Sequence, residues 1–357
     1  MREDRFSKSL MAWFKKNARK LPWRETSDPY KIWISEVMLQ QTTVSAVIPY
    51  YERWIKAFPT LESVAKTPLD KILRHWQGLG YYERARNIHK AARMICRDYQ
   101  GRIPADTLEL KKLPGFGSYT TGAVLSIAFD QRHPIIDANV RRVMMRQLGV
   151  KGYADSSWDP SIHEHLKKRM PRQEINIFNQ ALMELGALIC RNKAPLCLSC
   201  PVNRNCLAYQ KGIQDRIPAL KKRVTQKVDV AIALIRRQDF YFIQRRPPKG
   251  LFADLWEFPG GKIGKGESPQ QALYREMQEE LNVSVQAHKF LFVVDQFYTQ
   301  FRARLQVFEC VVQPDPSCNT THKWVKLQNL PRYAMPSGSV KIVNKLLGID
   351  RLKNSRI

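Results

Sequence analysis

The sequence has no apolar run approaching the length of about 18 residues that a membrane-spanning helix needs, and its first residues lack the uncharged apolar core of a signal peptide. Seven cysteines in 357 residues are too few for a disulfide framework. Glycine and proline are not enriched, and no repeat or low-complexity segment occurs, which excludes collagen-like and disordered chains. These absences predict a cytoplasmic globular protein with a packed core and no membrane partner.

Acidic residues are scarce as well. The chain has 59 lysines and arginines against 32 aspartates and glutamates, a net charge of +27, and most of the excess precedes residue 224. Such a charge predicts a polyanionic partner. A basic surface that only keeps the protein soluble is the alternative at this point.

The length predicts two or three domains at about 150 residues each. Residues 1–213 are expected to be mostly helical, because apolar side chains recur at helical spacing in 30–58, around Leu73, and in 88–95, 123–129 and 140–148. Residues 214–226 are expected to form a basic linker. Residues 227–350 are expected to be α+β, with strands at 228–235, 240–243, 289–294 and 303–312 and a helix at 270–281.

Four of the seven cysteines lie within seventeen residues, as Cys190-x6-Cys197-x2-Cys200-x5-Cys206. Four sulfur atoms so close together would repel each other as thiolates and oxidise as thiols unless a metal centre held them. Zinc and a 4Fe–4S cluster both accept four cysteines. The uneven spacing does not resemble a zinc ribbon.

A turn with two glycines, Gly115 and Gly117, joins two expected helices. Glycines let the backbone approach an anion closely, and the start of the following helix offers unpaired N–H groups and the positive end of the helix dipole. The stretch 113–122 therefore predicts a phosphate grip that is independent of base sequence. An ordinary turn is the alternative.

Two carboxyl side chains are distinguished by their surroundings. Glu36 lies inside the apolar helical run 34–42, where burial would raise its pKa and keep it protonated at neutral pH. Asp137 stands at an expected helix N-cap, which would keep it ionised, although an ordinary cap is the simpler interpretation. A neutral acid and an anion are the pair that breaks a glycosidic bond through a cationic transition state.

The cysteine spacing and the glycine turn resemble the iron–sulfur loop and the helix-hairpin-helix motif of the endonuclease III superfamily, and 35–42 and 137–140 are similar to the active-site motifs of the MutY family of adenine DNA glycosylases. The resemblance implies a monomeric, nucleoid-associated enzyme that excises adenine mispaired with 8-oxoguanine or guanine in double-stranded DNA. It implies that Glu36 protonates the base, that Asp137 steadies the sugar cation and that Asn139 orients a catalytic carboxylate. It also implies a 4Fe–4S cluster on the four cysteines, and DNA contacts from the hairpin residues Leu113, Gly115, Gly117 and Thr120.

Three further positions follow from the same resemblance. Tyr119 stands where endonuclease III-type enzymes carry a nucleophilic lysine, which implies base release without efficient strand cleavage. Gln41 and Tyr82 match positions that wedge into the duplex when the target base is flipped out. An endonuclease III-like glycosylase and lyase, a nucleotide hydrolase with a helical tether, and a non-catalytic DNA-binding protein are the rival interpretations.

The expected helix 270–281 carries a second constellation, in which Glu276, Glu279 and Glu280 share one face. Like charges at this spacing repel each other, and Mg²⁺ would relieve the repulsion, although a solvated acidic face is the alternative. With Gly261, Glu267 and Arg275 the spacing resembles the box of Nudix hydrolases, and only Asn282 replaces a usual glycine. The resemblance implies a MutT-like domain that reads 8-oxoguanine, and the retained acids suggest hydrolysis of an oxidised nucleoside triphosphate.

A reading loop of the family aligns with Tyr298, Thr299 and Gln300 in this chain. The predicted fold class is multidomain. An all-α helix-hairpin-helix glycosylase domain covers 1–213, with the hairpin near 108–128 and the iron–sulfur loop at 190–206. After the linker 214–226, an α+β Nudix domain, similar to MutT, covers 227–350.

Overall fold

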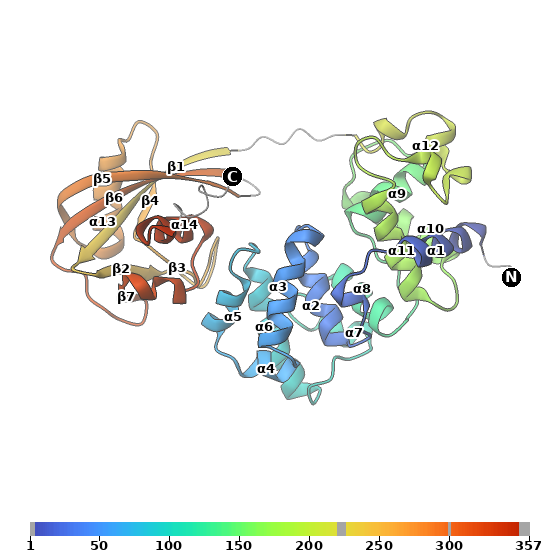
Figure 1. Cartoon of the computed structure of the whole chain (residues 1–357), viewed down its shortest axis with the longest axis horizontal. Coiled ribbons are helices and arrows are strands. Elements are labelled where there is room, and N and C mark those ends of the chain that lie inside the picture. The colour runs from blue at the N-terminus through green and yellow to red at the C-terminus, as the bar shows by residue number, and fades with distance from the viewer. Residues whose placement is uncertain (1–3, 220–225, 299–300, 350–357) are drawn as a thin grey trace. The chain divides into compact units, whose positions relative to one another are not determined.

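The computed structural model describes residues 4–219, 226–298 and 301–349 (Figure 1). They form two compact units. The first holds residues up to 66 and from 87 to 219, and the second holds residues 67–86 and those from 226 onward. Within the described residues, no helix has the length and apolar character needed to cross a bilayer.

The first unit is helical. Its helices are α1 (Arg5–Asn17), α2 (Pro29–Leu39), α3 (Val44–Ala57), α4 (Leu61–Lys66), α6 (Glu83–Asp98, from residue 87 onward), α7 (Thr107–Lys111), α8 (Ser118–Ala128), α9 (Ala138–Leu148), α10 (Asp159–Arg169), α11 (Ile175–Leu188) and α12 (Leu207–Gln210). The helical pattern predicted over 30–58 is divided between α2 and α3. The chain breaks between them because Gln41 adopts a left-handed backbone conformation, with φ at 56°.

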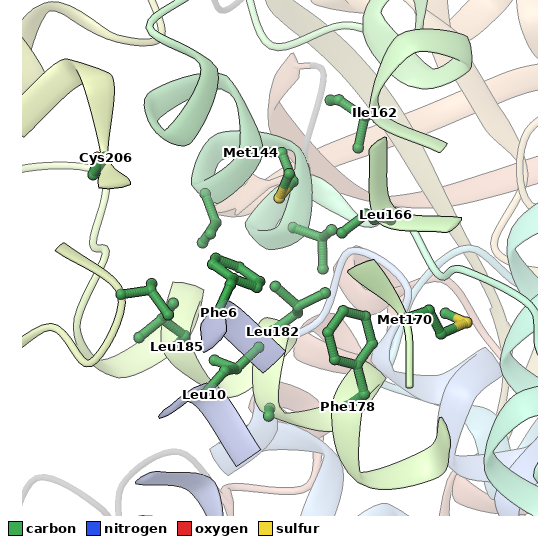
Figure 2. Close-up of a cluster of buried hydrophobic side chains, with 14 of the residues drawn as sticks. Phe6, Leu10, Met144, Ile162, Leu166, Met170, Phe178, Leu182, Leu185 and Cys206 are labelled. Atoms are coloured by element: carbon green, nitrogen blue, oxygen red, sulfur yellow. The ribbon is translucent and has the colours of Figure 1, made fainter. Parts of the chain in front are cut away.

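Helix α11 fixes the centre of the first unit, because it packs against α1, α8 and α9. The apolar faces of α1, α9, α10 and α11 meet in one buried cluster (Figure 2), whose members include Phe6, Leu10, Met144, Leu166, Phe178 and Leu182. Burying a side chain of this size stabilises the folded chain by about 1.5–3 kcal/mol. The cluster therefore holds α9 and α11 together along most of their length.

The second unit is built on a seven-stranded sheet with the order β3-β2-β1-β6-β5, in which β4 pairs with β1 and β7 pairs with β2. The central pair β1–β6 is parallel, and the other pairs are antiparallel. The strands are β1 (Gln226–Arg237), β2 (Phe240–Arg245), β3 (Trp256–Glu257), β4 (Gly260–Lys262), β5 (Ser284–Phe297), β6 (Phe301–Gln313) and β7 (His322–Lys326).

Two helices cover the two faces of this sheet. In β1, Ala231 and Ala233 join the apolar cluster of α13 (Pro269–Leu281), whereas Ile232 and Leu234 join that of α14 (Ser337–Leu346). Successive side chains of a strand point to opposite faces, so the two helices lie on opposite sides. The second unit also contains α5 (Leu69–Trp76), which precedes residue 86.

The predicted strands and the helix of this part are confirmed, but three strands were not predicted. Strands β3 and β4 have only two and three residues, and β7 has five. Runs this short carry too little alternation to be recognised. Strand β5 also begins at Ser284, five residues earlier than the predicted 289.

Candidate active site

Helix α2 brings Glu36 into the interior of the first unit. Asp28 caps the helix by accepting a hydrogen bond from the Tyr30 N–H at 2.9 Å, and Pro29 occupies the first turn. The helix is apolar on nearly all sides, so Glu36 is only 4% exposed. It lines a cavity of about 700 Å³ together with Tyr119, Asp137 and Asn139.

The environment of Glu36 favours its neutral form. Burial and, to a lesser extent, nearby Asp137 raise the pKa of this carboxyl to about 7. The Tyr119 hydroxyl, which donates to Glu36 Oε2 at 2.7 Å, and the Arg24 guanidinium act in the opposite direction. At neutral pH, Glu36 therefore holds its proton in a large fraction of the molecules.

Asp137 is the N-cap of α9, as predicted. Its carboxylate accepts hydrogen bonds from the Val140 N–H at 2.7 Å and from Asn139 Nδ2 at 2.9 Å. Burial raises the pKa of Asp137, and these hydrogen bonds oppose that shift. The cap and Asn139 thus favour the predicted anion, whereas burial opposes it.

Tyr119 enters the cavity from the first turn of α8, whose N-cap is Gly117. Burial and the carboxyls of Glu36 and Asp137 raise the pKa of its phenol well above the usual range, so the hydroxyl keeps its hydrogen. Two arginines and no lysine are found among the described residues that line the cavity. A Schiff-base nucleophile is therefore not part of this described lining.

The sequence analysis missed a buried ion cluster on the wall of the same cavity. Glu184 of α11 accepts hydrogen bonds from the guanidinium groups of Arg19 at 2.7 Å and Arg24 at 2.9 Å, and the pKa of Glu184 falls to about 2 because these bonds outweigh its burial. A carboxyl within the apolar stretch 175–188 was the available signal, of the same kind as that of Glu36. Its arginine partners lie about 160 residues away in sequence, so no local pattern reveals them.

Arg142 connects the Asp137 segment to the cysteine-rich loop. Its Nη2 donates to Asn139 Oδ1 at 2.9 Å, and its Nε donates to the carbonyl of Cys190 at 2.8 Å. Nearby, Arg146 Nη1 donates to Cys190 Sγ at 3.2 Å. A continuous set of hydrogen bonds therefore runs from the aspartate to the first cysteine of the loop.

The four cysteines of the loop surround one cavity, and none of them forms a disulfide. Burial and, to a lesser extent, the neighbouring sulfurs of Cys190, Cys206 and Cys197 raise the pKa of the Cys200 thiol to about 12. Throughout the described part of the chain, no three His, Cys, Asp or Glu side chains converge as ligands of a single metal ion. Four cysteine thiolates are a donor set that both a 4Fe–4S cluster and a zinc ion accept.

The hairpin residues lie at two depths. Gly115 and Gly117 are exposed at the turn, and Gly115 has a φ of 82°. Leu113 and Thr120 are buried, and the Thr120 hydroxyl accepts from Gln40 Nε2 at 3.1 Å. A DNA contact of these two residues, which stays a prediction, would have to use their backbone groups.

The two expected wedge residues differ in accessibility. Gln41 is exposed and lines the mouth of the cavity in the first unit. Tyr82 is only 4% exposed in the second unit, where its hydroxyl donates to the carbonyl of Met335 at 3.2 Å. Insertion of Tyr82 into DNA stays a prediction, and it would require this hydrogen bond to break.

In the second unit, Arg275 links the acidic residues of the Nudix-like box. It pairs with Glu267 at 3.0 Å, Glu276 at 2.7 Å and Glu279 at 3.2 Å. Glu280 is exposed and accepts from Gln244 Nε2 at 2.7 Å. Of the predicted Mg²⁺ ligands, Glu276 and Glu279 thus pair with Arg275, whereas Glu280 is bonded to Gln244.

The expected reading loop is described only in part. Tyr298 packs against Phe252 and Phe301, with ring centroids 5.0 and 4.8 Å away, and its hydroxyl accepts from the Gly338 N–H at 3.3 Å. Thr299 and Gln300 lie outside the described residues.

Comparison with known proteins matches both halves of the chain to families. Residues 34–170 match the model of the "HhH-GPD superfamily base excision DNA repair protein", and residues 230–345 match that of the "NUDIX domain". The adenine DNA glycosylase of Buchnera aphidicola subsp. Schizaphis graminum is 38% identical and covers 71% of this chain and 74% of its own. The Rattus norvegicus adenine DNA glycosylase is 30% identical and covers 94% and 77%.

Solved structures of DNA repair enzymes match the helical part of the chain. A thermostable thymine-DNA glycosylase matches with a TM-score of 0.52 and 30% identity, covering 58% of this chain and 95% of its own. An endonuclease III–DNA complex matches with a TM-score of 0.50 and 27% identity, over 58% and 95%.

Proposed function

Because the chain belongs to the family of adenine DNA glycosylases, we propose that it excises adenine from A:8-oxoguanine and A:G mispairs in double-stranded DNA, with Glu36 as the acid and Asp137 as the stabilising anion. The observation that carries this proposal is the shared cavity, in which Glu36, with a pKa of about 7, and a hydrogen-bonded Asp137 line the same space. Such a pair is what cleavage of an N-glycosidic bond requires.

In the proposed reaction, Glu36 gives its proton to the flipped adenine, and the electron pair of the C–N bond leaves with the base. The deoxyribose becomes an oxocarbenium-like cation, which the Asp137 carboxylate stabilises at short range. Water then adds to the cation, and the ionised Glu36 accepts the proton from this water. Tyr119 holds the Glu36 carboxyl in place throughout, and Asn139 fixes Asp137.

The wall formed by Arg24 and Glu184 is suited to the edge of a purine. Both groups are charged but paired, at 2.9 Å, so they present a donor and an acceptor without leaving an unpaired charge in the cavity. A purine ring presents alternating ring-nitrogen acceptors and amino donors. We assign this wall to recognition of the extruded base.

The cysteine cavity is proposed to hold a 4Fe–4S cluster on Cys190, Cys197, Cys200 and Cys206. When bound, the cluster would fix the conformation of the loop, with no part in the base chemistry. The loop carries three exposed cations, Arg191, Lys193 and Arg204, which would then face the DNA backbone. A visible absorption band near about 400 nm, characteristic of iron–sulfur charge transfer, tests this assignment.

The central experiment measures adenine release from duplexes with A opposite 8-oxoguanine, G, C or T. Strand scission is scored with and without alkali. We expect release mainly opposite 8-oxoguanine and G, and scission only after alkali, because Tyr119 replaces the lysine of the lyase branch. Scission without alkali in proportion to base release, with borohydride trapping, would contradict the monofunctional assignment.

We propose a second activity for the Nudix-like unit, the Mg²⁺-dependent hydrolysis of an oxidised nucleoside triphosphate. The supporting observation is that Asn282, the one departure from the box, adopts the left-handed conformation that a glycine would supply, with φ at 53°. Pyrophosphate release from 8-oxo-dGTP by the full chain, lost in Glu280→Gln and retained in Glu309→Gln, is the expected result. Equal release by the two variants would contradict it.

In the same unit we propose that Tyr298, Thr299 and Gln300 contact the 8-oxoguanine that pairs with the target adenine. A tyrosine and a glutamine lack a group that titrates near neutral pH, so this contact depends on hydrogen bonding alone. The ratio of excision opposite 8-oxoguanine to excision opposite G, measured in Gln300→Ala, tests the role. An unchanged ratio would argue against it.

A further inference from the structure

The Tyr119 hydroxyl has one hydrogen and two acceptors. Glu36 Oε2 lies 2.7 Å from the phenol oxygen, and the thioether sulfur of Met183 lies 3.9 Å from it. A thioether is a weak but polarisable acceptor. The hydroxyl can point at only one of these atoms at a time, and protonation of Glu36 weakens the carboxyl as an acceptor relative to the sulfur.

Met183 is held in position by its helix. Its neighbour Glu184 is fixed by Arg19 and Arg24, and α11 is packed against α8 and α9. Its own side chain is half-buried and lines the same cavity as Glu36 and Tyr119. The sulfur therefore forms part of the cavity wall beside the phenol.

We propose that the Met183 thioether is a positioning residue, which accepts the Tyr119 hydrogen whenever Glu36 carries its proton and thereby supports the acid form of Glu36. An ionised Glu36 attracts the phenol hydrogen, because a carboxylate is the stronger acceptor. A protonated Glu36 has an O–H of its own and a weaker acceptor oxygen than the carboxylate. When its O–H donates to the phenol oxygen, the phenol hydrogen turns elsewhere. The sulfur provides that second direction.

The charged and titratable groups that face Glu36 come from three other elements. They are Tyr119 of α8, Asp137 at the start of α9, and Arg24 of the short 3-10 helix Pro22–Arg24. Replacing Met183 with leucine changes none of them and nearly keeps the volume. The leucine variant lacks the sulfur that accepts the Tyr119 hydrogen when Glu36 is protonated. The protonated form of Glu36 is thereby destabilised, so the pKa of Glu36 should fall.

The proposed role of Met183 rests on the proposed role of Glu36. Two readouts distinguish a failure of the Met183 proposal from a failure of the proposed function. The first is the single-turnover rate of adenine release against pH, and the second is the infrared band of the protonated Glu36 carboxyl in the free protein, identified by its absence in Glu36→Gln. The second readout needs no activity. A wild-type protein that releases no adenine would refute the proposed function, while the band would still test the inference.

In both readouts we expect Met183→Leu to lower the pH midpoint by about half a unit, which is about a threefold lower rate on the alkaline limb. Met183→Gln, which restores an acceptor of similar length, should return the midpoint to the wild-type value or above it. Met144→Leu, in the buried cluster of α9, is the matched control and should not shift it. In a Tyr119→Phe background, Met183→Leu should have no further effect.

An unchanged midpoint in Met183→Leu would overturn the proposal, whatever happens to the maximal rate. A shift of equal size in the Tyr119→Phe background would overturn it too, because the sulfur would then act without the hydroxyl. A purely structural role would lower the rate at every pH without moving the midpoint.

Discussion

Burial of Glu36 has two opposing effects. It makes the carboxyl an acid near neutral pH, but it lowers the stability of the folded protein once the carboxyl ionises. Burial raises its pKa from 4.5 to about 7, while the Tyr119 hydrogen bond and Arg24 limit the rise. The neutral form is thus abundant at the pH where the glycosidic bond must be broken. Catalytic acids are generally most effective when their pKa lies near the working pH.

Replacing Glu36 with glutamine should lower the single-turnover rate of adenine release by about 10³-fold, because the amide fits the site but has no proton to donate. Affinity for the mispaired duplex should change little. Glu52→Gln on the exposed side of α3 is the matched control. Full base release by Glu36→Gln would mean that another group is the acid.

The same carboxyl should make the stability of the protein depend on pH. Its folded pKa of about 7 lies above the ordinary value of 4.5, so the folded state binds more protons than the unfolded state between these values, and stability falls as pH rises through this window. The loss amounts to about 3 kcal/mol above pH 7. Thermal unfolding of Glu36→Gln should therefore occur at a higher temperature than that of the wild type at pH 8, and the difference should shrink towards pH 5.

Arg142 acts through the geometry of its guanidinium group and not only through its positive charge. Its guanidinium donates to Asn139 Oδ1, to the Gly186 carbonyl at 2.7 Å and to the Cys190 carbonyl. The compact ammonium group of a lysine cannot donate to all three acceptors at once. Arg142→Lys should slow adenine release about tenfold or more, through loss of the Asn139 and Asp137 orientation, whereas Arg172→Lys on the surface should have no effect.

At the scale of elements, the hairpin between α7 and α8 uses its two glycines differently. Gly115 has a φ of 82°, and an added Cβ would lie 3.0 Å from Asn87 Cβ. Gly117 has an ordinary φ of −72° and open space around it. The first glycine is needed for the turn itself, and the second leaves room for a ligand.

We therefore expect a contrast between two alanine variants. Gly115→Ala should lower the free energy of unfolding by about 1–3 kcal/mol, because a left-handed conformation is strained for alanine. Gly117→Ala should leave the unfolding energy within about 0.5 kcal/mol of the wild type. Both should weaken DNA binding, since the methyl of either one obstructs the approach of a phosphate. Tight DNA binding by Gly117→Ala would exclude the turn as a phosphate grip.

At the scale of the whole molecule, the net charge of +27 makes DNA affinity dependent on salt. The exposed Lys193 of the cysteine-rich loop has no ion pair among the residues that the structure describes. Lys193→Gln should weaken binding to all duplexes alike, and it should reduce the slope of log K against log salt by about 0.9. Lys168→Gln, a charge already paired with Glu164 at 2.7 Å, is the control. Equal slopes in Lys193→Gln and the wild type would remove Lys193 from the DNA contact.

The sequence by itself determined the helical and sheet-containing parts of the chain, because periodicities of 3.6 and 2 residues are local properties. It also singled out Glu36, Asp137, Tyr119 and the four cysteines, each through its neighbours in sequence or through a family motif. Asn282 was visible as a departure from the box, and its left-handed backbone accounts for it.

Only the tertiary structure decided which side chains share a cavity. The partners of Glu184 are about 160 residues away, and Met183 meets Tyr119 across 64 residues. Such contacts depend on how α2, α8 and α11 pack against each other, and the same apolar pattern is compatible with many packings. Electrostatics follows the same rule, because a pKa is set by burial and by charges that are close in space, not by those adjacent in sequence.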